Sequence, residues 1–212
     1  MNTKSLTVLC KGATERNFVV KTLAPHLRLR SVVAKPVDLG GTPSMASLHN
    51  QINNALADRR DHVFVTTMLD LYRLGNFPGN EAQTGEHVRT RIARIESALS
   101  ARFANPNFIP YIQLHEFEAL IFVDVEKIPI AFPDGEADHA VAKLKSLVGD
   151  IEPELINERP NHAPSKRIIN LIEAYKPVKW SAGPEIVEEI GLLRVRNACP
   201  NFNQWVSRLE SL

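Results

Sequence analysis

The sequence has no excess of charge of either sign. Its 25 lysines and arginines face 24 aspartates and glutamates, so the formal net charge is +1. A strongly basic domain is the simplest electrostatic signature of a nucleic-acid-binding protein, and this chain lacks it. A local basic groove is still compatible with the balance, because a few lysines on one face suffice to contact phosphates.

Cysteines and long apolar runs are also scarce. Only Cys10 and Cys199 are present, and neither belongs to a Cys-x-x-Cys or Cys/His zinc pattern. This favours a reduced, cytoplasmic location, with one disulfide between the two as the alternative. No apolar run approaches the roughly 20 residues that span a bilayer. The first residues lack the cleavage site of a signal peptide, so we expect no membrane partner.

What is present is an alternation of strand and helix patterns. β-branched or apolar runs predict strands at 5–10, 31–37, 62–72 and 107–114. Helical spacing or caps predict helices at 15–27, 45–59, 86–103 and 115–122. This order predicts an α/β fold with a largely parallel, four-stranded sheet flanked by helices. After about residue 124 strand signals nearly vanish. We therefore predict an α/β core over 1–123 and a mostly helical C-terminal elaboration of the same domain over 124–212.

Four residues give local predictions. Thr14 is expected to cap the first helix, and Pro25 to end it or lie just past its end. Ser44 is expected to cap the second helix. Pro110, inside the last strand, indicates an edge strand or a bulge.

Acidic residues follow three of the predicted strands. Glu15 comes after the first strand, Asp70 ends the third, and Glu116 and Glu118 follow the fourth, with His115 beside them. Ligands of parallel α/β sheets bind beyond the carboxyl ends of the strands. Converging carboxylates there suit one or two Mg²⁺ or Mn²⁺ ions, which can act on a phosphodiester.

Each acid also has a purely structural interpretation. Glu15 is equally compatible with a first-turn acid favoured by the helix dipole. Asp70 is compatible with a turn former, and Glu116 and Glu118 with a helix cap and a solvated residue. "HEFEAL" is not the His-Glu-x-x-His zinc motif, because position 119 is Ala, so zinc protease chemistry is not expected.

A second cluster lies in "APSKR", residues 163–167. Ser165, Lys166 and Arg167 fall in the first turn of a predicted helix, where cations oppose the helix dipole. An anion such as phosphate on the free N–H groups would offset that cost. We therefore predict that these residues and His115 bind a phosphate and that Lys166 stabilises its developing charge. A solvated basic turn is the alternative.

Two further helical patterns are interpreted structurally. Arg89, Arg91 and Arg94 are expected on a solvated helix face, with a nucleic-acid contact as the alternative. Phe202, Trp205 and Leu209 have helix-face spacing, and they are expected to close the core.

Long motifs give the chain a resemblance. "GATER", "TTMLDLYRLGNFPG", "FIPYIQLHEFEALIF", "APSKR" and "RNACPNFNQW" occur in this order over nearly the whole sequence. Together they resemble the bacterial domain-of-unknown-function family 4276 (DUF4276), which is similar to the Toprim-like nucleases of topoisomerases, primases and overcoming-lysogenization-defect proteins. The resemblance implies a Toprim-like Rossmannoid fold, metal-dependent nuclease activity, and an ABC-type or AAA-type ATPase partner in anti-phage defence.

The resemblance also implies roles for individual residues. The family's first strand typically ends Val-Glu-Gly-x-x-Glu, and here Glu15 matches the second glutamate while Lys11 replaces the first. Asp70, Glu116 and Glu118 match the remaining acids and would hold the metal with Glu15, which would also be catalytic. The usual second aspartate is absent, because position 72 is Tyr. Lys166 resembles the catalytic lysine of the related nucleases by position.

Lys11 leaves two hypotheses open. An ammonium would repel a divalent ion and could pair with Glu15, Asp70 or Glu116 instead. The site is then degenerate, or carries an engineered substitution, or uses one metal and the other acids. The chain is accordingly a Mg²⁺- or Mn²⁺-dependent nuclease acting on nucleic acid, or a non-catalytic binding or regulatory subunit. A homo-oligomer is compatible with both.

Overall fold

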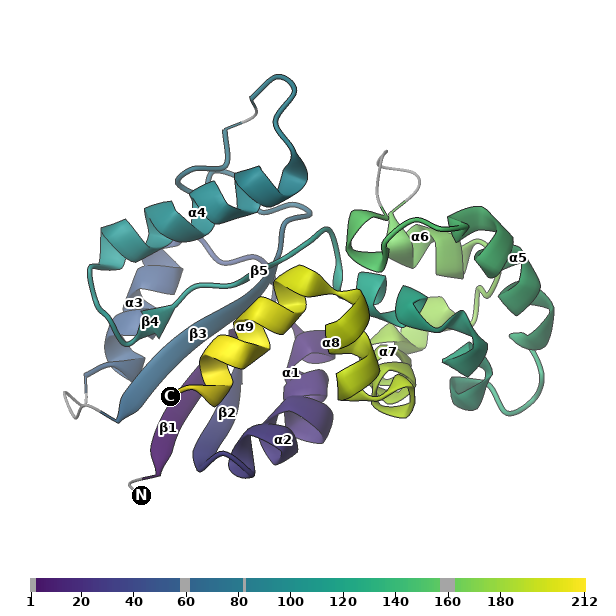
Figure 1. The fold of residues 1–212 in the computed structure, drawn as a ribbon, viewed down its shortest axis with the longest axis horizontal. Coiled ribbons are helices and arrows are strands. Elements are labelled where there is room, and N and C mark those ends of the chain that lie inside the picture. Colours follow the sequence, from purple (N-terminus) through teal and green to yellow (C-terminus); the bar gives the residue numbers. More distant parts are fainter. Residues whose placement is uncertain (1–2, 58–61, 82, 157–162) are drawn as a thin grey trace.

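The fold, seen in a computed structural model, is a parallel sheet between two layers of helices (Figure 1). The structure describes residues 3–57, 62–81, 83–156 and 163–212. The sheet has the order β2-β1-β3-β4, and β5 continues along β3 beyond β4. The strands are β1 Lys4–Cys10, β2 Val32–Asp38, β3 Val63–Asp70, β4 Phe108–Ile109 and β5 Ile112–Gln113. The predicted α/β fold with a parallel sheet of about four strands is confirmed.

All strand pairs are parallel, so the carboxyl ends of the strands meet at one edge. Cys10, the last residue of β1, is level with Asp38 of β2 and Met68 of β3. Gln113 of β5 is level with Asp70 at the end of β3. The turns that follow β1, β3 and β5 therefore open onto one common region.

Helices cover both faces of this sheet. They are α1 Ala13–Phe18, α2 Ala24–Arg28, α3 Met45–Ala55, α4 Val88–Phe103, α5 Asp138–Val148, α6 Pro164–Ile169, α7 Tyr175–Ile190, α8 Leu192–Ala198 and α9 Pro200–Glu210. The 3₁₀ segments are η2 Phe117–Val123, η3 Val125–Ala131 and η4 Pro153–Leu155. One apolar core contains side chains of α1, α2, α7 and α9, and a second contains those of α3 and α4. Figure 1 shows α5 and α6 set apart from the sheet, beyond the carboxyl ends of the strands.

Pro110 divides the last strand as expected of an edge position. It separates β4 from β5, and threonine side chains of β3 replace the missing backbone ladder. Thr67 Oγ1 accepts from the Tyr111 N–H and donates to the Tyr111 carbonyl, both at 2.9 Å. Thr66 Oγ1 donates to the Ile109 carbonyl at 2.6 Å and accepts from Trp205 Nε1 at 2.9 Å. The buried threonines thus hold the strand beside β3 and anchor α9 to the same place.

The first helix differs from the prediction at both ends. Its N-cap is Gly12 rather than Thr14, because Glu15 accepts the Gly12 N–H at 3.0 Å. Pro25 does not end it. A π-helical segment, Val19–Leu23, connects α1 to α2, which continues to Arg28. Proline has no N–H group to donate within a helix. Pro25 lies in the first turn of α2, directly after the π-helical segment, where the hydrogen-bond pattern changes and this donor is not needed.

Several other local predictions are confirmed. Ser44 caps α3 by accepting the Ser47 N–H at 3.1 Å, although residues 58 and 59 of the predicted helix lie outside the described ranges. Phe202, Trp205 and Leu209 are buried. Both cysteines are buried and free.

The C-terminal helix α9 is also anchored by a buried acid. Glu154 is fully buried and accepts the backbone N–H groups of Asn201 and Phe202 at 2.9 and 2.8 Å. A carboxylate at the N-terminus of a helix is favoured by the helix dipole.

No helix of the described residues is long and apolar enough to cross a bilayer.

Candidate functional site

An ion pair between Lys11 and Asp70 is at the centre of the candidate site. Lys11 follows β1 and Asp70 ends the neighbouring β3, and Lys11 Nζ lies 2.9 Å from Asp70 Oδ2. The exposed fractions of the two side chains are 21% and 7%, so water screens this pair only weakly. The other carboxylate oxygen, Asp70 Oδ1, is buried and has no hydrogen-bond partner among the described residues.

Glu15 reaches the site from the first turn of α1. Its Oε2 atom accepts the Gly12 N–H, so one oxygen caps the helix. Burial and the charges of Asp70 and Glu118 together raise the pKa of Glu15 to about 8, although the nearby Lys11 acts to lower it. Glu15 therefore both caps the first helix and belongs to the acidic cluster.

Glu116 joins the site to the segment that the sequence singled out for phosphate. Its Oε2 atom accepts the backbone N–H of Ser165 at 3.0 Å, at the start of α6. Both residues are buried. The anion on this N–H group in the structure is therefore the Glu116 carboxylate, which connects the turn after β5 to α6.

Glu118 lies on η2 and contacts a residue that the sequence analysis missed. The Tyr175 hydroxyl donates to Glu118 Oε1 at 3.4 Å, and both side chains are buried. One turn further along α7, the charge of Lys179 lowers the pKa of both Asp70 and Glu118. Prolines near Tyr175 and Lys179 argue against a helix in this stretch of the sequence. Sequence patterns therefore did not point to either residue.

The structure therefore brings the four predicted acids together. Burial raises the pKa of Asp70 to about 6, because it outweighs the favourable effect of Lys11. Burial and the charges of Glu116 and Asp70 raise the pKa of Glu118 to about 7. Burial lowers the pKa of Lys11, but Asp70, Glu15 and Glu116 together raise it above its ordinary value. Lys11 is thus a firmly protonated cation among carboxyls that resist ionisation.

The remaining predicted residues lie around this cluster. His115 has the left-handed backbone angle φ of 60°, which costs a residue other than glycine about 1 kcal/mol. Burial lowers the pKa of His115 to about 4. Lys166, which follows Ser165 in the chain, is exposed. Arg167 Nη1 donates a hydrogen bond to the Leu147 carbonyl of α5 at 3.0 Å. One donor group of this guanidinium is therefore bound to α5.

The acids do not form a ready metal site in this arrangement. No three aspartate, glutamate, histidine or cysteine side chains within the described ranges are placed so that they could hold one ion. One carboxylate oxygen of Glu15 and one of Glu116 each accept a hydrogen bond from a backbone N–H group, and one oxygen of Asp70 accepts from Lys11. The residues present therefore fit a lysine ammonium beside Asp70 better than a divalent ion.

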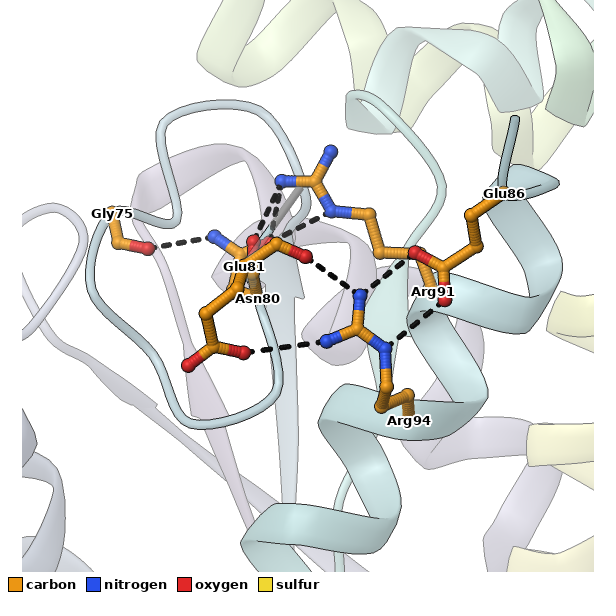
Figure 2. Close-up of polar contacts among 6 residues, drawn as sticks. All are labelled: Gly75, Asn80, Glu81, Glu86, Arg91 and Arg94. Carbon is orange, nitrogen blue, oxygen red and sulfur yellow. Dashed lines mark hydrogen bonds and ion pairs between the residues drawn. The ribbon is translucent and has the colours of Figure 1, made fainter. Parts of the chain in front are cut away.

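The loop that follows Asp70 is held by the arginines of α4 (Figure 2). We call residues 71–81 and 83–87 the β3–α4 loop. Arg91 donates to Asn80 Oδ1 from Nε at 3.0 Å, and Asn80 Nδ2 donates to the Gly75 carbonyl at 2.6 Å. Arg94 binds Glu86 through Nε at 3.0 Å and Nη2 at 2.7 Å, and Nη1 reaches Glu81 at 3.3 Å.

These contacts correct the interpretation of the α4 arginines. Arg91 and Arg94 bind the β3–α4 loop, and Arg89 pairs with Glu152 and, at 3.6 Å, with Glu154. The expectation of a solvated face is therefore wrong. The alternating arginines were visible in the sequence, but their acceptors come from other segments.

A cavity of about 540 Å³ lies away from the acids, between α4, β4 and α9. Its lining includes Glu96, Tyr111 and Arg208. None of the strand-end acids lines it. We place the candidate site at the acids, because buried carboxyls with raised pKa values gather there.

Comparison with known families places the chain. Residues 10–210 match the family described as Domain of unknown function (DUF4276), and the chain belongs to this family. No protein of curated function matches the sequence.

Comparison with solved structures gives low identities over nearly the whole chain. The C-terminal region of the Burkholderia pseudomallei OLD protein is similar with a TM-score of 0.50 at 12% identity, over 100% of this chain and 98% of that one. The C-terminal region of the Xanthomonas campestris pv. campestris OLD protein has a TM-score of 0.43 at 13% identity, over 98% of both chains.

Proposed function

We propose that this member of the DUF4276 family is a nuclease-derived protein that binds nucleic acid at the carboxyl ends of β1, β3 and β5, with Lys11 in the place of a metal ion. The observation that carries the proposal is the ion pair of Lys11 Nζ with Asp70 Oδ2 at 2.9 Å. The lysine provides a positive charge among four carboxyls, where a divalent ion would otherwise be needed to offset them. It does so without an exchangeable cofactor.

Charge around the site supports an anionic ligand. Lys166 and Lys179 are exposed beside the acids, and neither forms a hydrogen bond or ion pair with any residue that the structure describes. Exposed lysines that lie close together attract phosphates. In this function Lys166, Ser165, Arg167 and His115 contribute to phosphate binding.

Metal-dependent hydrolysis is the second candidate. The buried Asp70 Oδ1 favours it, because this atom has no hydrogen-bond partner among the described residues and could accept a ligand. Glu15, Asp70, Glu116 and Glu118 would hold Mg²⁺ or Mn²⁺ once Lys11 left Asp70, and Glu15 and Lys166 would be catalytic. We derive no reaction step through the ion, because the carboxylates are occupied as they stand.

Titration with Mn²⁺ in a calorimeter tests these two candidates on the wild-type protein, Lys11→Glu and Lys11→Met. The proposed binding function predicts no Mn²⁺ binding by the wild type and binding by Lys11→Glu. Lys11→Met controls for loss of the ammonium without a new ligand. Tight Mn²⁺ binding by the wild type would contradict the lead proposal and favour the metal-dependent nuclease.

Nucleic acid binding is measured directly, without divalent ions. Anisotropy of labelled single-stranded and duplex DNA and RNA gives the affinity of the wild type and of Lys166→Gln. Lys35→Gln, on the edge strand β2, is the matched control because Lys35 is also exposed and unpaired among the described residues. Absence of any binding at low salt would sink the proposed function.

We also propose a separately encoded ABC-type or AAA-type ATPase partner and a role in anti-phage defence. The solved structure with a TM-score of 0.50 is the C-terminal region of an OLD protein, where this fold is joined to a further region of chain. Co-purification of this chain with an ATPase encoded beside it tests the idea.

A further inference from the structure

A half-exposed tryptophan lies next in the chain to a lysine of the candidate site. The exposed fraction of Trp180 is 51%, so about half of this large aromatic residue is in contact with water. Trp205, the other tryptophan, is 4% exposed and stacks on Tyr111 with ring centres 4.2 Å apart. Packing thus accounts for Trp205 but leaves much of the Trp180 ring in contact with water.

Trp180 lies on the helix that contributes Tyr175 and Lys179 to the site, and its backbone is bound to α1. Asn17 Nδ2 donates to the Trp180 carbonyl at 2.9 Å, and Asn17 lies two residues after Glu15 on α1. On α7 itself, Tyr175 binds Glu118 little more than one turn before Trp180. The two elements that Trp180 belongs to or contacts, α7 and α1, therefore both contribute residues to the site.

Two exposed lysines lie near Trp180 on α7. Lys176 lies one turn before Trp180, on the same side of the helix, and Lys179 precedes it in the chain, on the adjoining side. Neither lysine forms a hydrogen bond or ion pair within the described ranges, and the charge of Lys179 also reaches Asp70 and Glu118. An exposed aromatic ring beside exposed cations is the arrangement that binds single strands, where bases stack on the ring and phosphates contact the lysines.

We propose that Trp180 stacks against an unpaired base of a nucleic acid strand whose phosphates are bound by Lys176 and Lys179. This inference rests on the proposed nucleic acid binding at the same site and adds the strandedness of the ligand. A base within a duplex is stacked on its neighbours and cannot cover the ring. The surface therefore selects single-stranded over duplex nucleic acid.

The intrinsic fluorescence of the full chain tests this proposal in the absence of divalent ions. Trp180 and Trp205 are the two tryptophans, so Trp180→Phe leaves the emission of the buried Trp205 as a baseline. Oligothymidylate is expected to quench the wild-type emission, and a duplex of equal length is not. Trp180→Phe should lose the quenching and keep most of the affinity, because phenylalanine still stacks.

Affinity gives the second readout. Trp180→Ala is expected to weaken oligothymidylate binding about tenfold while duplex binding changes less than about twofold. Leu29→Ala is the control, since Leu29 is 83% exposed at the opposite end of the sheet, before β2. Lys179→Gln should weaken both ligands and reduce their salt dependence.

The outcomes separate this inference from the proposed function. If the wild type binds neither ligand, the proposed nucleic acid function fails and this inference fails with it. If Trp180→Ala binds both ligands as the wild type does, or loses both equally, the stacking role alone is wrong. Self-association that depends on Trp180, without quenching by oligothymidylate, would instead assign the ring to a contact between copies of the chain.

Discussion

Two groups of cations flank the carboxyl end of β3, and the structure uses them differently. On the α4 side, Arg91 and Arg94 are bound to the β3–α4 loop (Figure 2). On the α7 side, the exposed Lys166, Lys176 and Lys179 have no such partners among the described residues. The same charge thus stabilises a loop in one place and is available to a ligand in the other.

The difference shows why basic residues in a sequence do not by themselves locate a binding surface. Arginine offers several donors in a fixed plane, which suits the paired acceptors of the loop. A lysine ammonium on a flexible stem suits a phosphate that arrives from solution. Lys11 is intermediate, because it is a lysine used as an internal cation and paired with Asp70.

Breaking the buried pair should have the largest effect. We expect Lys11→Met to lower the free energy of unfolding by about 3 kcal/mol at pH 8, because Asp70 is left buried and charged without its partner. At pH 5, below the Asp70 pKa of about 6, the carboxyl is protonated and the loss should be smaller. Urea unfolding at both pH values measures this. An equal loss at pH 5 and pH 8 would contradict the ion-pair explanation.

The raised pKa values of Glu15 and Glu118 predict a pH dependence. A carboxyl whose pKa rises on folding stabilises the folded state below its unfolded pKa, and that contribution is lost as pH rises through the folded pKa. With folded values of about 8 and 7, stability should fall between pH 5 and pH 8.5. One titrating group gives a slope of order 1 kcal/mol per pH unit.

Urea midpoints measured across this pH range test that slope. Glu15→Gln should flatten the upper part of the curve, because the amide cannot ionise. The exposed Glu136→Gln is the control and should leave the curve unchanged. A wild-type stability that rises with pH would show that the sign is wrong.

The β3–α4 loop should tolerate one glycine substitution better than another. Gly79 has φ of 78°, and an added Cβ would lie 2.8 Å from the Arg94 carbonyl oxygen, whereas Gly75 has φ of 66° and open space. Gly75→Ala therefore measures backbone strain alone, about 1 kcal/mol. Gly79→Ala should cost more by thermal unfolding. Equal losses in the two variants would mean that the loop does not dock on α4 as described.

Removing the Arg94 contacts of the loop should have the smallest global effect. We expect Arg94→Gln to leave the global unfolding transition nearly unchanged, because its partners Glu81 and Glu86 both belong to the β3–α4 loop and not to the apolar core. Hydrogen exchange in the β3–α4 loop should accelerate, and the difference from wild type should shrink at high salt. Unchanged exchange would show that Arg94 does not hold the loop.

Local patterns predicted much of the fold. β-branched runs marked the strands, and the acids that follow them converge, as the parallel topology requires. Pro110 marked the interrupted edge strand correctly. Pro25 misled, because the π-helical segment before it accommodates the missing N–H.

The sequence by itself determined the elements and the edge of the sheet where the acids gather, because these depend on apolar periodicity and on residues near in the chain. Only the tertiary structure decided what each charge does. Lys11 meets Asp70 across 59 positions, and Tyr175 meets Glu118 across 57. Such contacts depend on how distant segments pack, and burial then shifts each pKa by an amount that no local pattern encodes.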